Sequence, residues 1–310
     1  MLQQVRAPTT VSLVLGGGGA RGLAHIGVIE WLTGNGYSIS SIAGSSMGAL
    51  VGGIYAAGRL DVYAEWVLAL ERFQVLRLLD PSLGRTGLFK GERIISVLRQ
   101  LIGERAIEEL AIDFTAVATD LESGEEVWLR DGKLFDAIRA SIATPLVFTP
   151  FRIGDRVLLD GALVNPVPMA AAGGAEAELT VAVNLGAPVE ALREPPKPTP
   201  KPDPEADTGS SAYAKRIRAF IEGMQRDAVP AAPTHRLLDI AFSSMQIMQD
   251  TIAQLKLAEI PPDITVQIPR NACGFYEFWR ARELIELGRE RAALAFAARA
   301  VDAAVRLTAA

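Results

Sequence analysis

The stretch Gly44-Ser45-Ser46-Met47-Gly48 decides the fold expected for this chain of 310 residues. An apolar run at residues 39–43 leads into it and has the length of a short buried strand. Residues 49–57, rich in alanine and glycine, leave it as a helix would. A G-x-S-x-G sequence between a strand and a helix holds its serine on a sharp, exposed turn, with the helix N-terminus behind the hydroxyl. The pattern makes Ser46 a candidate nucleophile, and a plain tight turn in an α/β core is the alternative.

A glycine-rich turn follows the strand-like residues 11–15. The four glycines Gly16–Gly19 expose a row of backbone N–H groups, and a helix expected near Gly22 adds its positive end. Such a loop binds an anion, either a phosphate or the oxyanion of an acyl-transfer intermediate. The loop also fits G-x-G-x-x-G, but no acidic residue for a ribose lies between Glu30 and Asp61, and no Gly-Lys-Ser/Thr follows. Nucleotide binding is therefore the weakest alternative.

A candidate base lies at Asp160, which follows the strand-like residues 156–159 and precedes a glycine. An Asp-Gly turn is the structural alternative. The only histidines are His25 and His235. A Ser-His-Asp hydrolase of this type places its histidine after the serine and the acid. His25 precedes the serine and is expected to pack or cap, and His235 is expected at the surface of a long helix. If the protein is a serine hydrolase, we expect Ser46 and Asp160 to act as a dyad.

The chain resembles the compact bacterial patatin-like phospholipases in four motifs that occur in family order. They are the glycine loop Gly17–Gly22, the serine motif Gly44–Gly48, the Ala-Ser-x-Ala-x-Pro block Ala140–Pro145 and the acid motif Asp160–Ala162. The resemblance is strong over residues 11–186 and looser beyond. It implies an α/β fold of three α/β/α layers with a mainly parallel central sheet. It also implies a serine acyl hydrolase that cleaves lipid carboxylic esters, as a phospholipase A or lysophospholipase does.

The resemblance assigns roles to individual residues. Ser46 would attack the ester carbonyl while Asp160 accepts its proton, and an apolar setting would raise the pKa of this acid. The backbone amides expected to hold the oxyanion are those of Gly17, Gly18 and Gly19. Arg21 has three interpretations: a substrate-binding cation near a lipid phosphate, a surface charge at the loop edge, or a residue that shapes the loop. No metal or other cofactor is expected, because the sequence has no Cys/His cluster.

Two other functions stay open at this point. An acyltransferase would use the same dyad and pass the acyl group to an alcohol. A noncatalytic regulatory or binding module would keep the fold, although intact Ser46, Asp160 and glycine loop argue against lost activity. A nucleic-acid partner is not expected at a net charge of −5 and a pI of about 5.3. The expected partner is a lipid ester, with transient contact to a membrane surface.

Composition predicts a cytoplasmic protein that can associate peripherally with a membrane. The single cysteine, Cys273, cannot form an internal disulfide, and residues 1–8 lack the apolar run of a signal peptide. Residues 31–58 carry no charge, yet their glycines and serines favour a strand, an elbow and a buried helix over a membrane span.

Strand-like and helix-like segments alternate along the chain, as in a parallel sheet covered on both faces. Further strands are predicted at residues 114–119, 126–129, 152–159 and 179–184, and helices at 60–79, 92–101 and 135–142. The apolar segment Phe73–Lys90, with scattered Arg and Lys, is a candidate lid or lipid-docking patch, and core packing is the alternative.

We expect three parts in the chain: a catalytic core at 9–186, an exposed linker at 187–211 and a mainly helical part at 212–310 that packs on the core. The linker is predicted because seven of the chain's eighteen prolines lie between Pro188 and Pro204. The last part is predicted to hold helices at 213–227, 234–259 and 283–304 and a strand at 264–268.

Overall fold

The computed structural model describes residues 7–82, 87–172, 177–191 and 237–308. The chain forms two units, residues 1–189 with 248–310 and residues 190–247. The first unit contains the central sheet. The predicted division at residues 187–211 and 212–310 stays a prediction, because residues 192–236 lie outside the described part.

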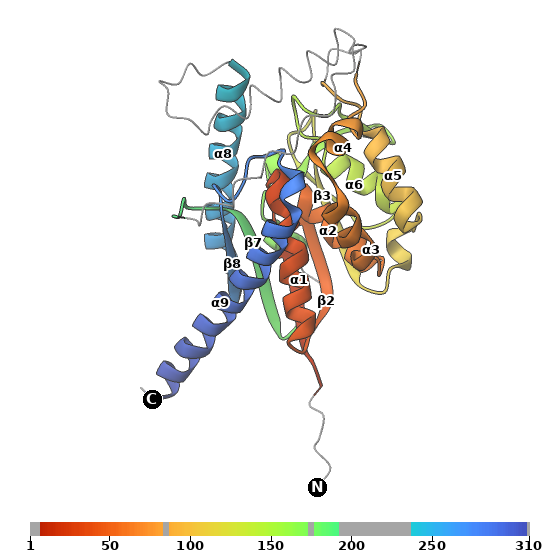
Figure 1. Cartoon of the computed structure of the whole chain (residues 1–310). Coiled ribbons are helices and arrows are strands. Elements are labelled where there is room, and N and C mark those ends of the chain that lie inside the picture. The colour runs from red at the N-terminus through yellow and green to blue at the C-terminus, as the bar shows by residue number, and fades with distance from the viewer. Residues whose placement is uncertain (1–6, 83–86, 173–176, 192–236, 309–310) are drawn as a thin grey trace, which may run out of the picture. The chain divides into compact units, whose positions relative to one another are not determined.

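An eight-stranded sheet runs through the described residues of the first unit in the order β5-β6-β3-β2-β1-β7-β8, with β4 also paired to β3. Figure 1 labels β2, β3, β7 and β8 of this sheet. Its strands are β1 (Thr9–Leu15), β2 (Tyr37–Ser45), β3 (Asp113–Asp120), β4 (Glu126–Leu129), β5 (Phe151–Ile153), β6 (Arg156–Asp160), β7 (Leu179–Ala187) and β8 (Ile264–Pro269). The pairs β1–β2, β1–β7, β2–β3 and β7–β8 are parallel, whereas β3–β4, β3–β6 and β5–β6 are antiparallel. The predicted mainly parallel sheet is therefore confirmed.

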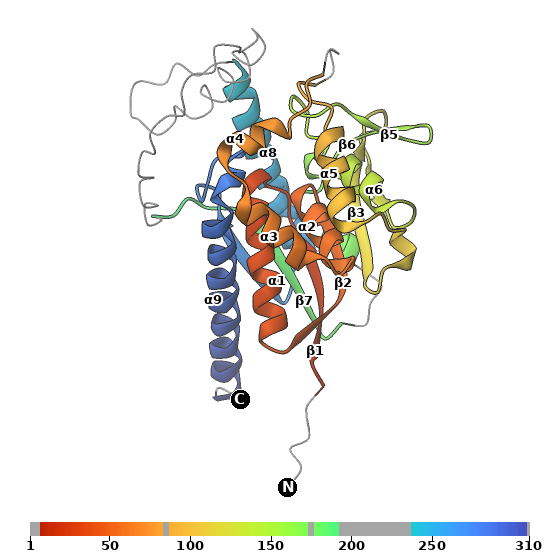
Figure 2. The ribbon, with the colours of Figure 1, turned by 45° about the vertical axis from the view of Figure 1, so that its right-hand side comes forward.

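Helices cover both faces of this sheet (Figure 2). They are α1 (Ala24–Gly34), α2 (Met47–Ala56), α3 (Leu60–Ala69), α4 (Arg72–Arg77), α5 (Glu92–Ile102), α6 (Leu134–Ser141), residues 248–259 of α8 (Leu237–Glu259), which are the part of α8 in the first unit, and α9 (Ala281–Thr308). Neighbouring side chains of a strand point to opposite faces. Accordingly Leu15 of β1 lies under Gly52 of α2, whereas Val14 packs in a buried cluster with Ala253 of α8. This arrangement confirms the predicted three layers.

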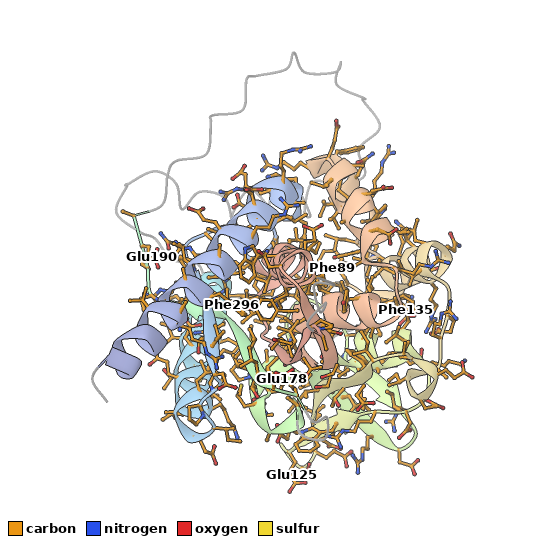
Figure 3. All side chains as sticks on the ribbon, turned by 90° about the horizontal axis from the view of Figure 1, so that it is seen from below. Phe89, Glu125, Phe135, Glu178, Glu190 and Phe296 are labelled. Atoms are coloured by element: carbon orange, nitrogen blue, oxygen red, sulfur yellow. The ribbon has the colours of Figure 1, made fainter. Side chains whose placement is uncertain are left out.

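Helix α9 packs closely on α1, because Gly27 of α1 and Gly288 of α9 each lie against the backbone of the other helix. A Cβ on Gly27 would lie 1.8 Å from the Ile285 carbonyl oxygen, and one on Gly288 would lie 2.0 Å from that of Ala24. Further along α9, the Phe296 ring lies 4.7 Å from that of Trp31, centroid to centroid (Figure 3). This contact fixes α1, the helix that follows the glycine loop.

Two predicted elements are wrong in extent. The strand predicted at 152–159 is the hairpin β5–β6, whose turn includes Gly154 at a φ of 58°, a left-handed conformation that a continuous strand excludes. The helix predicted at 60–79 is two helices, since Leu70 at the end of α3 is extended. The helix predicted at 213–227 lies outside the described residues. Among the helices that are described, none is long and apolar enough to cross a membrane.

Candidate active site

Ser46 sits on a strained turn between β2 and α2. Its φ is 54°, a conformation that costs free energy for any residue with a Cβ. The turn is tight enough that a Cβ on Gly44 would lie 2.4 Å from the carbonyl carbon of Gly48. A Cβ on Gly48 would in turn lie 2.0 Å from the Leu15 carbonyl oxygen of β1. Both glycines are therefore required by space, and the turn has the geometry of a nucleophile elbow.

A buried serine from another helix holds this turn in place. The Ser46 amide donates a 2.9 Å hydrogen bond to Oγ of Ser141, at the end of α6. The Ser141 hydroxyl in turn donates to the Val117 carbonyl of β3 at 2.6 Å. The hydrogen bonds of Ser141 thus tie the elbow to the neighbouring strand.

The strand register explains why the acid meets the serine. Strand β3 pairs with both β2 and β6, with Ser45 opposite Val117 and Asp160 opposite Ala118. Since Val117 and Ala118 are consecutive, the last residues of β2 and β6 come together. A Cβ on Gly161 would lie 2.1 Å from the Val117 carbonyl oxygen, so the residue after the acid has to be small. Packing alone therefore requires a glycine after Asp160.

The serine and the acid are hydrogen-bonded to each other. Ser46 Oγ lies 2.8 Å from Asp160 Oδ2. The same Oδ2 accepts a 2.5 Å hydrogen bond from Thr144 Oγ1, and Oδ1 accepts one of 2.9 Å from the Ala162 amide. Burial leaves 2% of Asp160 exposed and raises the pKa of its carboxyl, while these three hydrogen bonds act in the opposite direction. The result is a buried carboxyl with a pKa above that of an ordinary aspartate, a property that would suit a general base.

Backbone hydrogen bonds hold the glycine loop beside this pair. The Gly16 amide donates to the Val183 carbonyl at 3.0 Å, and the Gly17 amide donates to that of Pro166 at 2.9 Å. A Cβ on Gly17 would lie 3.2 Å from Cβ of Ser46, so the loop backbone directly contacts the serine. The Gly17 amide is thus already engaged. Among the described residues, the amides of Gly18 and Gly19 donate to no other group.

Arg21 lies behind the loop and is buried. It exposes 5% of its surface, so the interpretation as a surface charge at the loop edge is wrong. Its Nη1 donates a 3.0 Å hydrogen bond to the Arg270 carbonyl. Burial lowers the pKa of the guanidinium, and Cys273 and Asp250 nearby partly offset this.

Of the two histidines, the structure describes His25, and its hydrogen bond is to the glycine loop and not to Ser46. His25 is fully buried on α1, and its Nε2 donates a 2.8 Å hydrogen bond to the Gly16 carbonyl, which confirms its expected packing role. Burial lowers its pKa to about 4, so the ring is neutral. His235 lies outside the described residues.

Sequence reasoning missed the parts played by Ser141 and Thr144. Both belong to the block Ala140–Pro145, which the resemblance had singled out without a role for either hydroxyl. Their hydrogen bonds to Ser46 and Asp160 depend on long-range contacts that local spacing cannot supply. No group of three or more His, Cys, Asp and Glu side chains that could hold a metal occurs in the described parts of the chain.

A cavity of about 300 Å³ lies elsewhere, near the start of β3. Its lining includes Phe114, Thr115 and Arg130 but neither Ser46 nor Asp160. This cavity therefore does not mark the position of the hydrogen-bonded Ser46 and Asp160.

The family model described as patatin-like phospholipase matches residues 13–172. An uncharacterized NTE family protein of Mycobacterium bovis is 39% identical over 94% of this chain and 92% of its own length. A patatin-like phospholipase domain-containing protein of Caenorhabditis elegans is 32% identical over 60% of this chain, and the match spans 14% of that larger protein. The structure of VipD from Legionella pneumophila aligns with 94% of this chain and 67% of its own, at 12% identity and a TM-score of 0.41.

The matched domain extends from β1 to the short helix Met169–Ala172, so it includes the elbow, the glycine loop and the acid. The domain and the phospholipase names of the relatives support a lipid ester hydrolase. The chain belongs to the patatin-like phospholipase family.

Proposed function

We propose that the protein hydrolyses carboxylic esters of lipids through a Ser46–Asp160 dyad, as a phospholipase A or lysophospholipase. The observation that carries the proposal is the 2.8 Å hydrogen bond between Ser46 Oγ and Asp160 Oδ2, on a strained elbow beside a glycine loop. A serine hydroxyl is a weak nucleophile unless an adjacent base takes its proton. Asp160 is such a base, and its raised pKa brings it nearer to working pH.

In the proposed first step, Ser46 Oγ bonds to the ester carbonyl carbon and its proton passes to Asp160 Oδ2. The tetrahedral intermediate then collapses, the C–O bond to the leaving alcohol breaks, and Asp160 returns the proton to that alcohol. Water attacks the acyl-serine in the second step, with Asp160 again as the base. This releases the carboxylic acid and restores Ser46.

The oxyanion of both intermediates is assigned to the amides of Gly18 and Gly19. These amides have no other acceptor among the described residues, whereas the predicted third donor, Gly17, already donates to Pro166. We assign Gly17 to close backbone approach instead, because a side chain there would clash with Ala162, whose Cβ would be 2.6 Å away. The N-terminus of α2, which begins at Met47, adds a favourable dipole at the same place.

Arg21 is assigned to shaping the glycine loop. A direct contact with a lipid phosphate would require its guanidinium, now 5% exposed and bonded to the Arg270 carbonyl, to become accessible. Contact with a membrane surface is instead assigned to apolar side chains of the candidate lipid-docking segment. Phe73 and Leu88 are 58% and 40% exposed, and Arg77 lies over the Phe73 ring.

The test is hydrolysis of p-nitrophenyl esters from butyrate to palmitate, and of phospholipid vesicles, by the wild type and by Ser46→Ala. We expect turnover by the wild type and none by the variant, with both folded by circular dichroism. Undiminished turnover in Ser46→Ala would contradict the proposal. His235→Ala should keep its rate, and a large loss there would favour a triad. Product analysis with added glycerol separates hydrolysis from acyl transfer.

A further inference from the structure

Thr144 lies against the side of Asp160 that Ser46 also uses. Its hydroxyl donates to Oδ2 at 2.5 Å, the atom to which Ser46 Oγ donates at 2.8 Å. Thr144 is 4% exposed, so no bulk water competes for this contact. A carboxylate oxygen has two lone-pair positions, and these two hydroxyls occupy them.

The backbone around Thr144 is fixed by its own turn. The Phe148 and Val147 amides donate to the Thr144 carbonyl at 2.9 and 3.1 Å, and the Thr144 amide donates to the Ile142 carbonyl at 2.7 Å. The hydroxyl has a second acceptor in that Ile142 carbonyl, at 3.3 Å. One hydroxyl proton serves one strong bond, and the shorter contact is to the charged oxygen.

From this geometry we propose that Thr144 is a positioning residue that holds the Asp160 carboxylate in the orientation and charge state needed to accept the Ser46 proton. The inference rests on the proposed function. With Ala162 on Oδ1 and Thr144 on Oδ2, the carboxylate cannot rotate away from Ser46 without losing a hydrogen bond. The Thr144 bond also lowers the pKa that burial raises, and so keeps Asp160 ionised in an apolar site.

Replacing the hydroxyl without changing the shape tests this role. Thr144→Val removes the donor and keeps the branched side chain, whereas Thr144→Ser keeps the donor and loses a methyl group. We expect the acid limb of kcat/KM to move up by about one to two pH units in Thr144→Val, the size of a hydrogen bond to a charged group. Thr144→Ser should restore the wild-type limb. If Thr144 serves only to pack, the valine variant keeps the wild-type limb, and this result would overturn the inference.

Thr119 provides a matched control, because its hydroxyl donates to the backbone carbonyl of the same Asp160 at 2.8 Å and not to the carboxylate. Thr119→Val should leave the acid limb in place. Titration of the Asp160 carboxyl by 13C NMR, assigned with Asp160→Asn, reads the same shift without turnover. An unshifted carboxyl in Thr144→Val contradicts the inference even if hydrolysis is absent. Wild-type turnover that survives Ser46→Ala contradicts the proposed function alone.

Discussion

The serine elbow after β2 and the glycine loop after β1 lie at the same edge of the sheet, yet they are held in different ways. The elbow depends on space and on one side chain, since Gly44 and Gly48 allow the turn and Ser141 holds the Ser46 amide. The loop depends on backbone hydrogen bonds and on His25, which binds the Gly16 carbonyl. In the proposed mechanism the elbow supplies the reactive side chain and the loop supplies backbone donors, so substitutions should affect the two turns through different properties.

The largest effect is expected where the chemistry alone is removed. Asp160→Asn keeps both turns but takes away the base, and hydrolysis should fall at least about 10³-fold.

The Asp160→Asn variant should also be more stable than the wild type at pH 8, because burial disfavours the charged carboxylate. The folded-state pKa of Asp160 lies above the unfolded value. Wild-type stability therefore falls as pH rises from the unfolded pKa of about 3.9 through the folded one, and the asparagine variant lacks this pH dependence. Urea unfolding of the wild type and of Asp160→Asn at pH 5 and pH 8 measures the two stabilities and their pH dependence. An equal pH dependence of the two proteins would contradict the prediction.

Filling the space under the elbow should give the next largest effect. A Cβ in Gly48→Ala would lie 2.0 Å from the Leu15 carbonyl oxygen, and the backbone has to move to make room for it. We expect the free energy of unfolding to fall by about 3 kcal/mol and the hydrolytic activity to be lost. Gly34→Ala, at the end of α1 with no atom within 4 Å of the added Cβ, is the control and should be close to neutral. Similar losses in both variants would show that the elbow is not specially tight.

A smaller effect is expected from loosening the elbow. Ser141→Ala leaves the buried Ser46 amide and Val117 carbonyl without their partner. The cost should be about 1–3 kcal/mol in stability, with a fall in kcat and little change in KM. Chemical denaturation and steady-state kinetics give these values. A changed KM at constant kcat would mean that Ser141 acts on substrate binding instead.

The smallest effect at pH 7 should come from the loop's histidine. His25→Gln keeps an N–H donor for the Gly16 carbonyl and should cost about 1 kcal/mol at that pH. The folded-state pKa of His25 is about 4, below the ordinary 6.5, so the wild type loses stability as pH falls from about 6.5 to about 4. The glutamine variant should show a flatter stability curve over this range. A curve as steep as that of the wild type would place the acid sensitivity elsewhere.

Sequence patterns predicted the parts of the fold that depend on local rules. The elbow, the loop and the strand before Asp160 each combine an apolar run with glycines at positions where a side chain would clash. The split of the helix predicted at 60–79 was missed because the extended Leu70 carries no local signal. The hairpin within 152–159 was missed although Gly154-Asp155, the two residues between β5 and β6, are a typical two-residue hairpin turn.

In the candidate site, too, local motifs could be predicted from the sequence and long-range contacts could not. Ser46 and Asp160 could be named from their motifs, but their contact results from the register of both strands on β3. Burial of Arg21 and engagement of the Gly17 amide depend on residues far along the chain, such as Arg270 and Pro166. No local pattern contains such partners.

The measurement that tests the central claim most directly is covalent labelling by a fluorophosphonate, followed by intact-mass and peptide mapping. We expect one adduct, on Ser46, in the wild type, none in Ser46→Ala, and labelling at least about 100-fold slower in Asp160→Asn. An adduct on another residue, or labelling of Asp160→Asn at the wild-type rate, would contradict the dyad.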